Sequence, residues 1–136
     1  MDSALLTNYD QASMVEINNF PGYLIYSDGR VYSNKSNKFL KTTLNKYGYP
    51  RVVLWKNSKG YERKIHILVA QHFVENPLNL PEINHKDGNK LNTDYTNLEW
   101  STRSYNVKHA YNMGLMKPVH PLEYENYRRY ANGRRK

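Results

Sequence analysis

Residues 82–106 contain the side chains of this sequence that are best suited to cutting a phosphodiester bond. His85 carries an imidazole, whose ordinary pKa lies near neutrality, so it can accept a proton from water. Asn84 and Asn106 carry amide oxygens, which suit a hard cation such as Mg²⁺. A cation there would neutralise the charge that develops on the phosphate and on the leaving oxygen. Taken alone, the same residues would also fit an Asn-rich surface turn.

Two short strands and a helix are expected to position these side chains. The sequence predicts a strand at 83–85, a tight turn at 86–89, a polar loop at 90–96, a return strand at 97–100 and a helix at 103–112. Because adjacent strand residues point to opposite faces, Asn84 and His85 can serve one site only at a twisted strand end. Asn106 would then be presented from the helix. This order of elements is a ββα unit.

Residues 14–64 are expected to form an antiparallel β meander. Asp28 and Gly29 are a two-residue hairpin signal, and the β-branched and aromatic run 49–56 returns into 61–66. Apolar spacing predicts a helix at 67–74 that covers the sheet and stops before Pro77. The predicted fold class is therefore α+β: an N-terminal antiparallel meander with a covering helix, then a ββα unit, then a short C-terminal helical tail.

His66 and His72 lie beside the apolar face of the predicted helix 67–74. A histidine in that setting is usually packed and hydrogen-bonded within the core. We expect both residues to be core histidines rather than metal ligands.

The charge distribution indicates a polyanionic partner. The formal net charge is +8, and residues 30–66 contain ten Lys and Arg residues against Glu62 alone. A solvated basic face would explain this run too, but its interleaved Tyr and Trp residues favour nucleic acid. The basic residues that we expect to contact DNA are Arg30, Lys41, Arg51 and Lys56 in the meander and Lys86, Lys90, Arg103 and Lys108 around the loop. Each of them could equally be a solvated surface charge.

Composition narrows the chemistry further. The chain has no cysteine, which excludes disulfides and thiolate metal sites. No apolar run approaches the length of a membrane span, so no membrane partner is expected. A cytoplasmic protein is expected, in the host-cell cytoplasm if the chain is phage-encoded.

Several motifs follow one another along the chain in a fixed order, and together they indicate a function more specifically than any single motif does. The strings 84–90 and 97–102, followed by Asn106, His109 and Gly114, closely resemble HNH endonucleases of the phage and intron homing type. Residues 22–33 resemble the small β module often attached to these nucleases, and 65–77 resemble the segment that leads into their active site. The resemblance implies an N-terminal extension at 1–13, a DNA-contacting β module at 14–64, an HNH domain at 65–116 and a basic tail at 117–136.

The resemblance also implies roles for single residues. His85 is the general base, Asn106 is a metal ligand, and Asn97 braces the loop within a structural motif that includes Trp100. Asn84 takes a ligand position that is Asp in many members, so the site lacks one negative charge. His109 corresponds to a residue that is an additional ligand in some members, but because Asn106 already matches the ligand position, packing or a phosphate contact is favoured as its role.

The implied function is a metal-dependent, homing-like DNA endonuclease, phage-encoded, that leaves 5′-phosphate and 3′-hydroxyl ends. Its partner is double-stranded DNA, and its cofactor is a divalent ion, with Mg²⁺ favoured, Mn²⁺ second and Zn²⁺ less favoured. Two alternatives stay open. The Asn84 departure is compatible with a weak or inactive DNA-binding module, and the Tyr-rich segment 122–131 with an accessory protein of a phage assembly. The choice between a monomer and a homodimer is also open.

Overall fold

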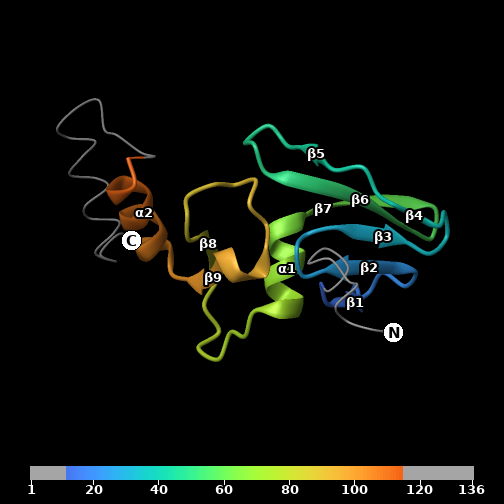
Figure 1. Ribbon diagram of the computed structural model, residues 1–136, viewed down its shortest axis with the longest axis horizontal. Helices are drawn as coiled ribbons and strands as arrows, with labels where there is room; N and C mark the ends of the chain where they lie inside the picture. The colour runs from blue at the N-terminus through green and yellow to red at the C-terminus, as the bar shows by residue number, and fades with distance from the viewer. Residues whose placement is uncertain (1–11, 115–136) are drawn as a thin grey trace, which may run out of the picture.

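The computed structural model describes residues 12–114, in which seven strands precede the first helix (Figure 1). These strands are β1 (Met14–Glu16), β2 (Tyr23–Tyr26), β3 (Val31–Ser33), β4 (Lys38–Phe39), β5 (Thr43–Leu44), β6 (Pro50–Lys56) and β7 (Lys59–Lys64). Then come α1 (Ile65–Phe73), β8 (Glu82–His85), a 3₁₀ turn η2 (Tyr95–Asn97), β9 (Leu98–Ser101) and α2 (Arg103–Asn112). The α+β class and the ββα unit are confirmed. The expected C-terminal helical tail and the Tyr-rich segment lie outside the described residues, as does most of the N-terminal extension.

The strands of the first half divide between two antiparallel sheets. One has the order β1-β2-β3-β4 and the other β5-β6-β7. The β2–β3 turn contains Gly29 at a φ of 101°, and the β6–β7 turn contains Asn57 and Ser58, both at positive φ. The β6–β7 turn is of the two-residue kind that matches the right-handed twist of the strands it joins. The β2–β3 connection is instead a three-residue loop over 27–29, in which the Gly29 backbone N–H donates to the Tyr26 carbonyl at 2.9 Å, so the two-residue turn predicted at Asp28 and Gly29 is one residue longer than expected. The predicted hairpins are therefore present, but they do not form one continuous sheet.

The core joins both sheets to the ββα unit through α1, which lies between them in Figure 1. Its fully buried side chains come from several elements: Ile25, Leu54, Ile65, Val69 and Leu98. Burying a side chain of this size contributes about 1.5–3 kcal/mol. Because α1 contacts strands of all three sheets, it fixes where the β8–β9 hairpin lies.

Two further contacts hold the ββα unit in place. The connection 86–97 rests on the β2–β3 turn, where the Tyr95 backbone N–H donates to the Ser27 carbonyl at 2.9 Å. A Cβ added to Gly29 would lie 2.1 Å from Thr93 Oγ1, so only glycine allows this approach. The indole of Trp100 donates to the Val74 carbonyl at 3.0 Å and ties β9 to the end of α1. No helix within residues 12–114 is long and apolar enough to span a membrane.

Candidate active site

The β8–β9 hairpin presents a strip of oxygen-bearing side chains to α2. The register pairs Glu82 with Ser101 and Asn84 with Glu99, so these four side chains share one face of the hairpin. Asn106 projects from α2 onto this strip. Its Oδ1 accepts from Ser101 Oγ at 2.6 Å, and its Nδ2 donates to Glu82 Oε1 at 3.0 Å.

The Asn84 amide is fixed by a carboxylate across the hairpin. Its Nδ2 donates to Glu99 Oε2 at 2.7 Å, and the Asn84 side chain is buried. Only the NH₂ end of the amide can donate, so this bond also determines how Oδ1 is oriented. The charge of Glu99, followed by burial and a hydrogen bond to Glu99, raises the pKa of the Tyr105 phenol on α2.

The oxygens of this strip are suited to a hard divalent cation. Asn84 and Asn106 offer amide oxygens, and the carboxylates of Glu82 and Glu99 lie beside them. Within the described part of the chain, no three His, Asp or Glu side chains come together as a metal-binding group. An ion held here would therefore depend on the amide oxygens and on oxygens of a bound substrate.

His85 packs in the opposite direction, toward α1. Its ring centroid lies 4.9 Å from that of His66 and 6.0 Å from that of Tyr49, and His66 in turn stacks on Tyr49 at 4.9 Å. Burial lowers the pKa of His85; Lys90 lowers it further, and Asp87 acts in the opposite sense. The imidazole is therefore neutral at pH 7, which is the form that can act as a base. Its buried Nε2 has no hydrogen-bond partner among residues 12–114.

Burial of His66 makes the folded protein sensitive to acid. Its pKa is lowered from 6.5 to about 4, chiefly by burial and further by His85 and Lys64. Between these two pH values the unfolded chain is protonated here and the folded chain is not, so this stability is complete above pH 6.5 and is lost toward pH 4. The loss is at most about 3 kcal/mol. Urea unfolding near neutral pH and near pH 4.5 should show this loss of stability in the wild type, and the loss should be largely absent in His66→Phe. Equal losses in the two proteins would contradict His66 as its source.

Asn97 holds the connection 86–97 in a closed loop. Its Oδ1 accepts from the Asp87 backbone N–H at 3.1 Å, and its Nδ2 donates to Asp87 Oδ1 at 2.9 Å and to the Asn92 carbonyl at 3.0 Å. The Lys86 backbone N–H donates to the Asn97 carbonyl at 2.7 Å. These bonds fix the chain that directly follows His85.

His109 also meets this loop. Its Nε2 lies 3.1 Å from the Lys86 carbonyl, and its ring stacks on Tyr105 at a centroid distance of 6.0 Å. One of its two ring nitrogens is thus already engaged by the protein backbone. This contact favours packing as the role of His109.

The predicted DNA contacts divide into two groups. Lys86, Lys90, Arg103 and Lys108 belong to the loop and α2, where Lys90 Nζ bonds the Tyr47 carbonyl at 3.0 Å and Arg103 pairs with Glu82 at 3.1 Å. In the meander, Lys41 is exposed, while Arg30 pairs with Asp28 and Arg51 with Glu62, each at 2.9 Å. The structure thus gives both meander arginines a partner within the protein.

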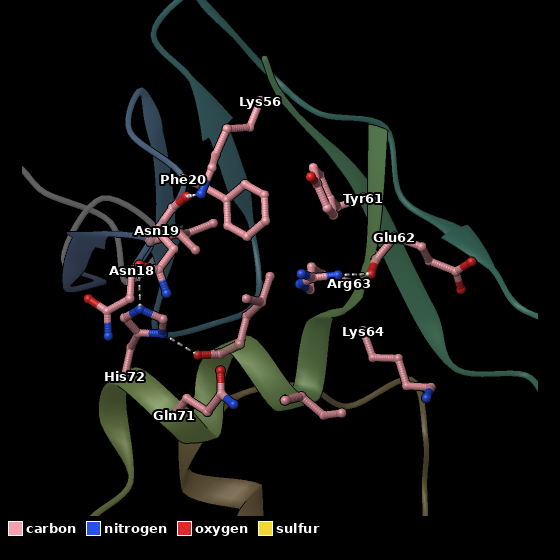
Figure 2. A pocket seen from close by; sticks show the side chains of 13 residues that line it. Asn18, Asn19, Phe20, Lys56, Tyr61, Glu62, Arg63, Lys64, Gln71 and His72 are labelled. Atoms are coloured by element: carbon pink, nitrogen blue, oxygen red, sulfur yellow. Dashed lines mark hydrogen bonds between the residues drawn. The ribbon is translucent and has the colours of Figure 1, made fainter. Parts of the chain in front are cut away.

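Lys56 lies on a separate cleft between the 18–20 loop, β7 and α1 (Figure 2). The cleft has a volume of about 1000 Å³, and neither Asn84, His85 nor Asn106 lines it. Lys56 Nζ donates to the Asn19 carbonyl at 2.8 Å and lies 5.3 Å from the Phe20 ring centroid. His72, at the base of the cleft, has both ring nitrogens hydrogen-bonded, as expected of a packed histidine.

Two residues of the site were not anticipated from the sequence. The sequence indicates Glu99 only as part of a strand. Its contact with Asn84 depends on the register of the hairpin, which the local sequence pattern does not determine. His66 was expected in the core, which is correct, but its stacking on His85 joins two elements far apart in the chain. We find no local signal in the sequence that would have indicated either contact.

The first strand of this hairpin ends on a histidine, and a helix that carries an amide side chain packs against the opposite face of the hairpin. This is the arrangement of a ββα nuclease. A family model described as HNH endonuclease matches residues 63–108. These residues of the chain belong to the HNH endonuclease family.

Viral and phage proteins are similar to this chain over most of its length. The chain is 44% identical over 93 residues to an uncharacterized HNH endonuclease, L245, of Acanthamoeba polyphaga mimivirus, and 43% identical over 94 residues to the DNA endonuclease I-HmuI of Bacillus phage SP01. These alignments cover 68% and 69% of this chain but only 28% and 54% of the two relatives. The chain thus spans about a quarter to a half of their length.

A solved structure gives the same fold. The structure described as DNA binding and cleavage by the HNH homing endonuclease I-HmuI matches with a TM-score of 0.73 and 35% sequence identity. The match covers 84% of this chain and 66% of that chain.

Proposed function

We propose that this protein is a metal-dependent DNA endonuclease. The observation that carries the proposal is the end of β8, where the buried, neutral imidazole of His85 directly follows Asn84 on the α2-facing strip. A base and a set of hard oxygen ligands are the two requirements of phosphodiester hydrolysis. Family membership over residues 63–108 and the named endonucleases among the relatives support the same reaction.

The residues divide the chemistry between them. His85 removes a proton from the attacking water, and its packing against His66 holds the ring in place. Asn84 and Asn106 would hold the cation through their amide oxygens, and a cation held there would help to position the scissile phosphate. A divalent ion bound there, which we take to be Mg²⁺ with Mn²⁺ as a substitute, would supply positive charge that offsets the negative charge developing during hydrolysis. The products carry 5′-phosphate and 3′-hydroxyl ends.

The substrate that we propose is double-stranded DNA, in the cytoplasm of a host cell. The net charge of +8 and the basic residues around the loop supply phosphate contacts without reading sequence. Binding that rests on such contacts weakens steeply as salt rises. The relatives encoded by phages and a virus support a homing-like role in a phage genome.

A plasmid assay tests the proposal. Supercoiled plasmid should become nicked or linear with Mg²⁺ and with Mn²⁺, react less with Zn²⁺, and stay intact with EDTA. Undiminished cleavage in EDTA would contradict metal dependence. Sequencing the ends of the products would check the predicted end chemistry.

A second candidate is a DNA-binding module that cuts weakly or not at all, and Asn84 is the observation that favours it. A neutral amide at a ligand position binds a cation less strongly than a carboxylate does. This candidate is expected to bind DNA in a salt-sensitive way and to leave plasmid intact with every metal. The plasmid assay therefore separates the two candidates.

A further inference from the structure

Asn84 and Glu99 form a matched pair across the β8–β9 hairpin. They are opposite residues in the register, and the amide Nδ2 lies 2.7 Å from the carboxylate Oε2. This is a short, charge-assisted hydrogen bond. Asn84 is buried and Glu99 is half-buried, so little solvent screens the bond.

The bond changes what the Asn84 oxygen can do. A carboxylate that accepts from the NH₂ end of an amide increases donation from the amide nitrogen into the carbonyl group, which pushes electron density onto the amide oxygen and makes that oxygen a stronger ligand. The same bond prevents the amide from turning its NH₂ group toward the ion. Partners of this kind orient metal ligands and raise their basicity.

The second amide of the strip has a similar bond but a different charge balance. Asn106 Nδ2 donates to Glu82 Oε1, but Glu82 also pairs with Arg103 at 3.1 Å. Within residues 12–114, Glu99 forms no ion pair. Glu99, which is hydrogen-bonded to Asn84 and to the Tyr105 phenol, therefore contributes to the strip a negative charge that no ion pair among these residues neutralises.

We propose that Glu99 is a positioning residue of the metal site, and that its carboxylate supplies, through the Asn84 amide, the charge that Asn84 itself lacks. This inference rests on the metal-dependent function proposed above. In this pair, Asn84 contributes the oxygen that binds the ion, and Glu99 contributes the negative charge.

A reciprocal exchange tests the pair, with Mn²⁺ alone as the probe and calorimetry as the measurement. Glu99→Gln should weaken Mn²⁺ binding by roughly 10- to 100-fold, the usual cost of losing a partner of a metal ligand. The double variant Asn84→Asp with Glu99→Gln restores one carboxylate and one amide to the pair, so its affinity should return to within about threefold of the wild type. Glu75→Gln removes an exposed carboxylate outside the strip and serves as the charge control.

The single variant Asn84→Asp gives an independent check. It places two carboxylates at hydrogen-bond distance, so the melting temperature of the metal-free protein should fall below that of the wild type and of the double variant. An unchanged melting temperature would contradict the pairing. Plasmid cleavage by the folded variants should follow the same order as Mn²⁺ affinity.

Besides the melting temperature, three results of Mn²⁺ binding would overturn the inference, and they differ in what they imply for the proposed nuclease function. If Glu99→Gln binds Mn²⁺ within twofold of the wild type, Glu99 has no part in the site. If the double variant binds as weakly as Glu99→Gln alone, the glutamate acts only through local structure. In both cases the proposed nuclease function stands. If the wild type binds no Mn²⁺, the inference and the metal-dependent function fail together.

Discussion

Replacing His85 with alanine is expected to stop plasmid cleavage while leaving DNA affinity close to that of the wild type. The imidazole is neutral at pH 7 because burial lowers its pKa, and in the proposed mechanism this neutral form is the one that accepts the proton of the attacking water. Loss of a general base typically costs about 10²- to 10⁴-fold in rate. Supercoiled plasmid in Mg²⁺ or Mn²⁺ gives the rate, and a gel-shift assay at fixed salt gives the affinity.

A second variant distinguishes loss of the base from loss of the fold. His85→Ala leaves a gap beside His66 and Tyr49, whereas His85→Gln fills more of that space without supplying a comparable base. Both variants should be inactive, and both should bind DNA if the fold persists. Persistent nicking by either folded variant would rule out His85 as the base.

The elements of the site were predictable where short-range signals determine them. The helix at 103–112 was predicted correctly because a capping residue marks its start: Thr102 Oγ1 accepts from the Tyr105 backbone N–H at 3.1 Å. The return strand predicted at 97–100 is present as Leu98–Ser101, one residue later, because Asn97 closes the 3₁₀ turn before it. The helix predicted at 67–74 in fact begins at Ile65. Its first residue directly follows β7, and Lys64 provides no side-chain cap, so the sequence contains no start signal.

The contacts within the site depend on longer-range geometry. Asn84 faces Glu99 because β8 and β9 pair in one register. That register depends on the path of the connection 86–97, which the Asn97 bonds and the contact with the β2–β3 turn hold in place. The division of the meander into two sheets likewise depends on which strands pair. Patterns of apolar and polar residues predict strands, but they do not determine partners separated by a long loop. The roles assigned to His85, Asn84 and Asn106 therefore stay predictions that the variants must test.

Asn97→Ala is expected to produce the largest loss of stability among single changes in the loop. The variant loses three side-chain hydrogen bonds, two to Asp87 and one to the Asn92 carbonyl, at a site where Asn97 is only 8% exposed. At about 1–1.5 kcal/mol for each bond, the free energy of unfolding should fall by about 3–4.5 kcal/mol. Urea unfolding at neutral pH measures this loss. The matched control is Asn89→Ala on the same loop, an exposed residue whose side chain accepts one bond from the Leu91 backbone N–H.

Cleavage should fall with Asn97→Ala even where the protein remains folded. The Asn97 carbonyl and side chain hold Lys86 and Asp87, the two residues that directly follow His85, so a looser loop changes where the base lies relative to the phosphate. Asn89→Ala leaves these bonds in place and should cleave at nearly the wild-type rate. If folded Asn97→Ala also cleaved at the wild-type rate, the position of His85 would have to be set by its packing against His66 and Tyr49 alone.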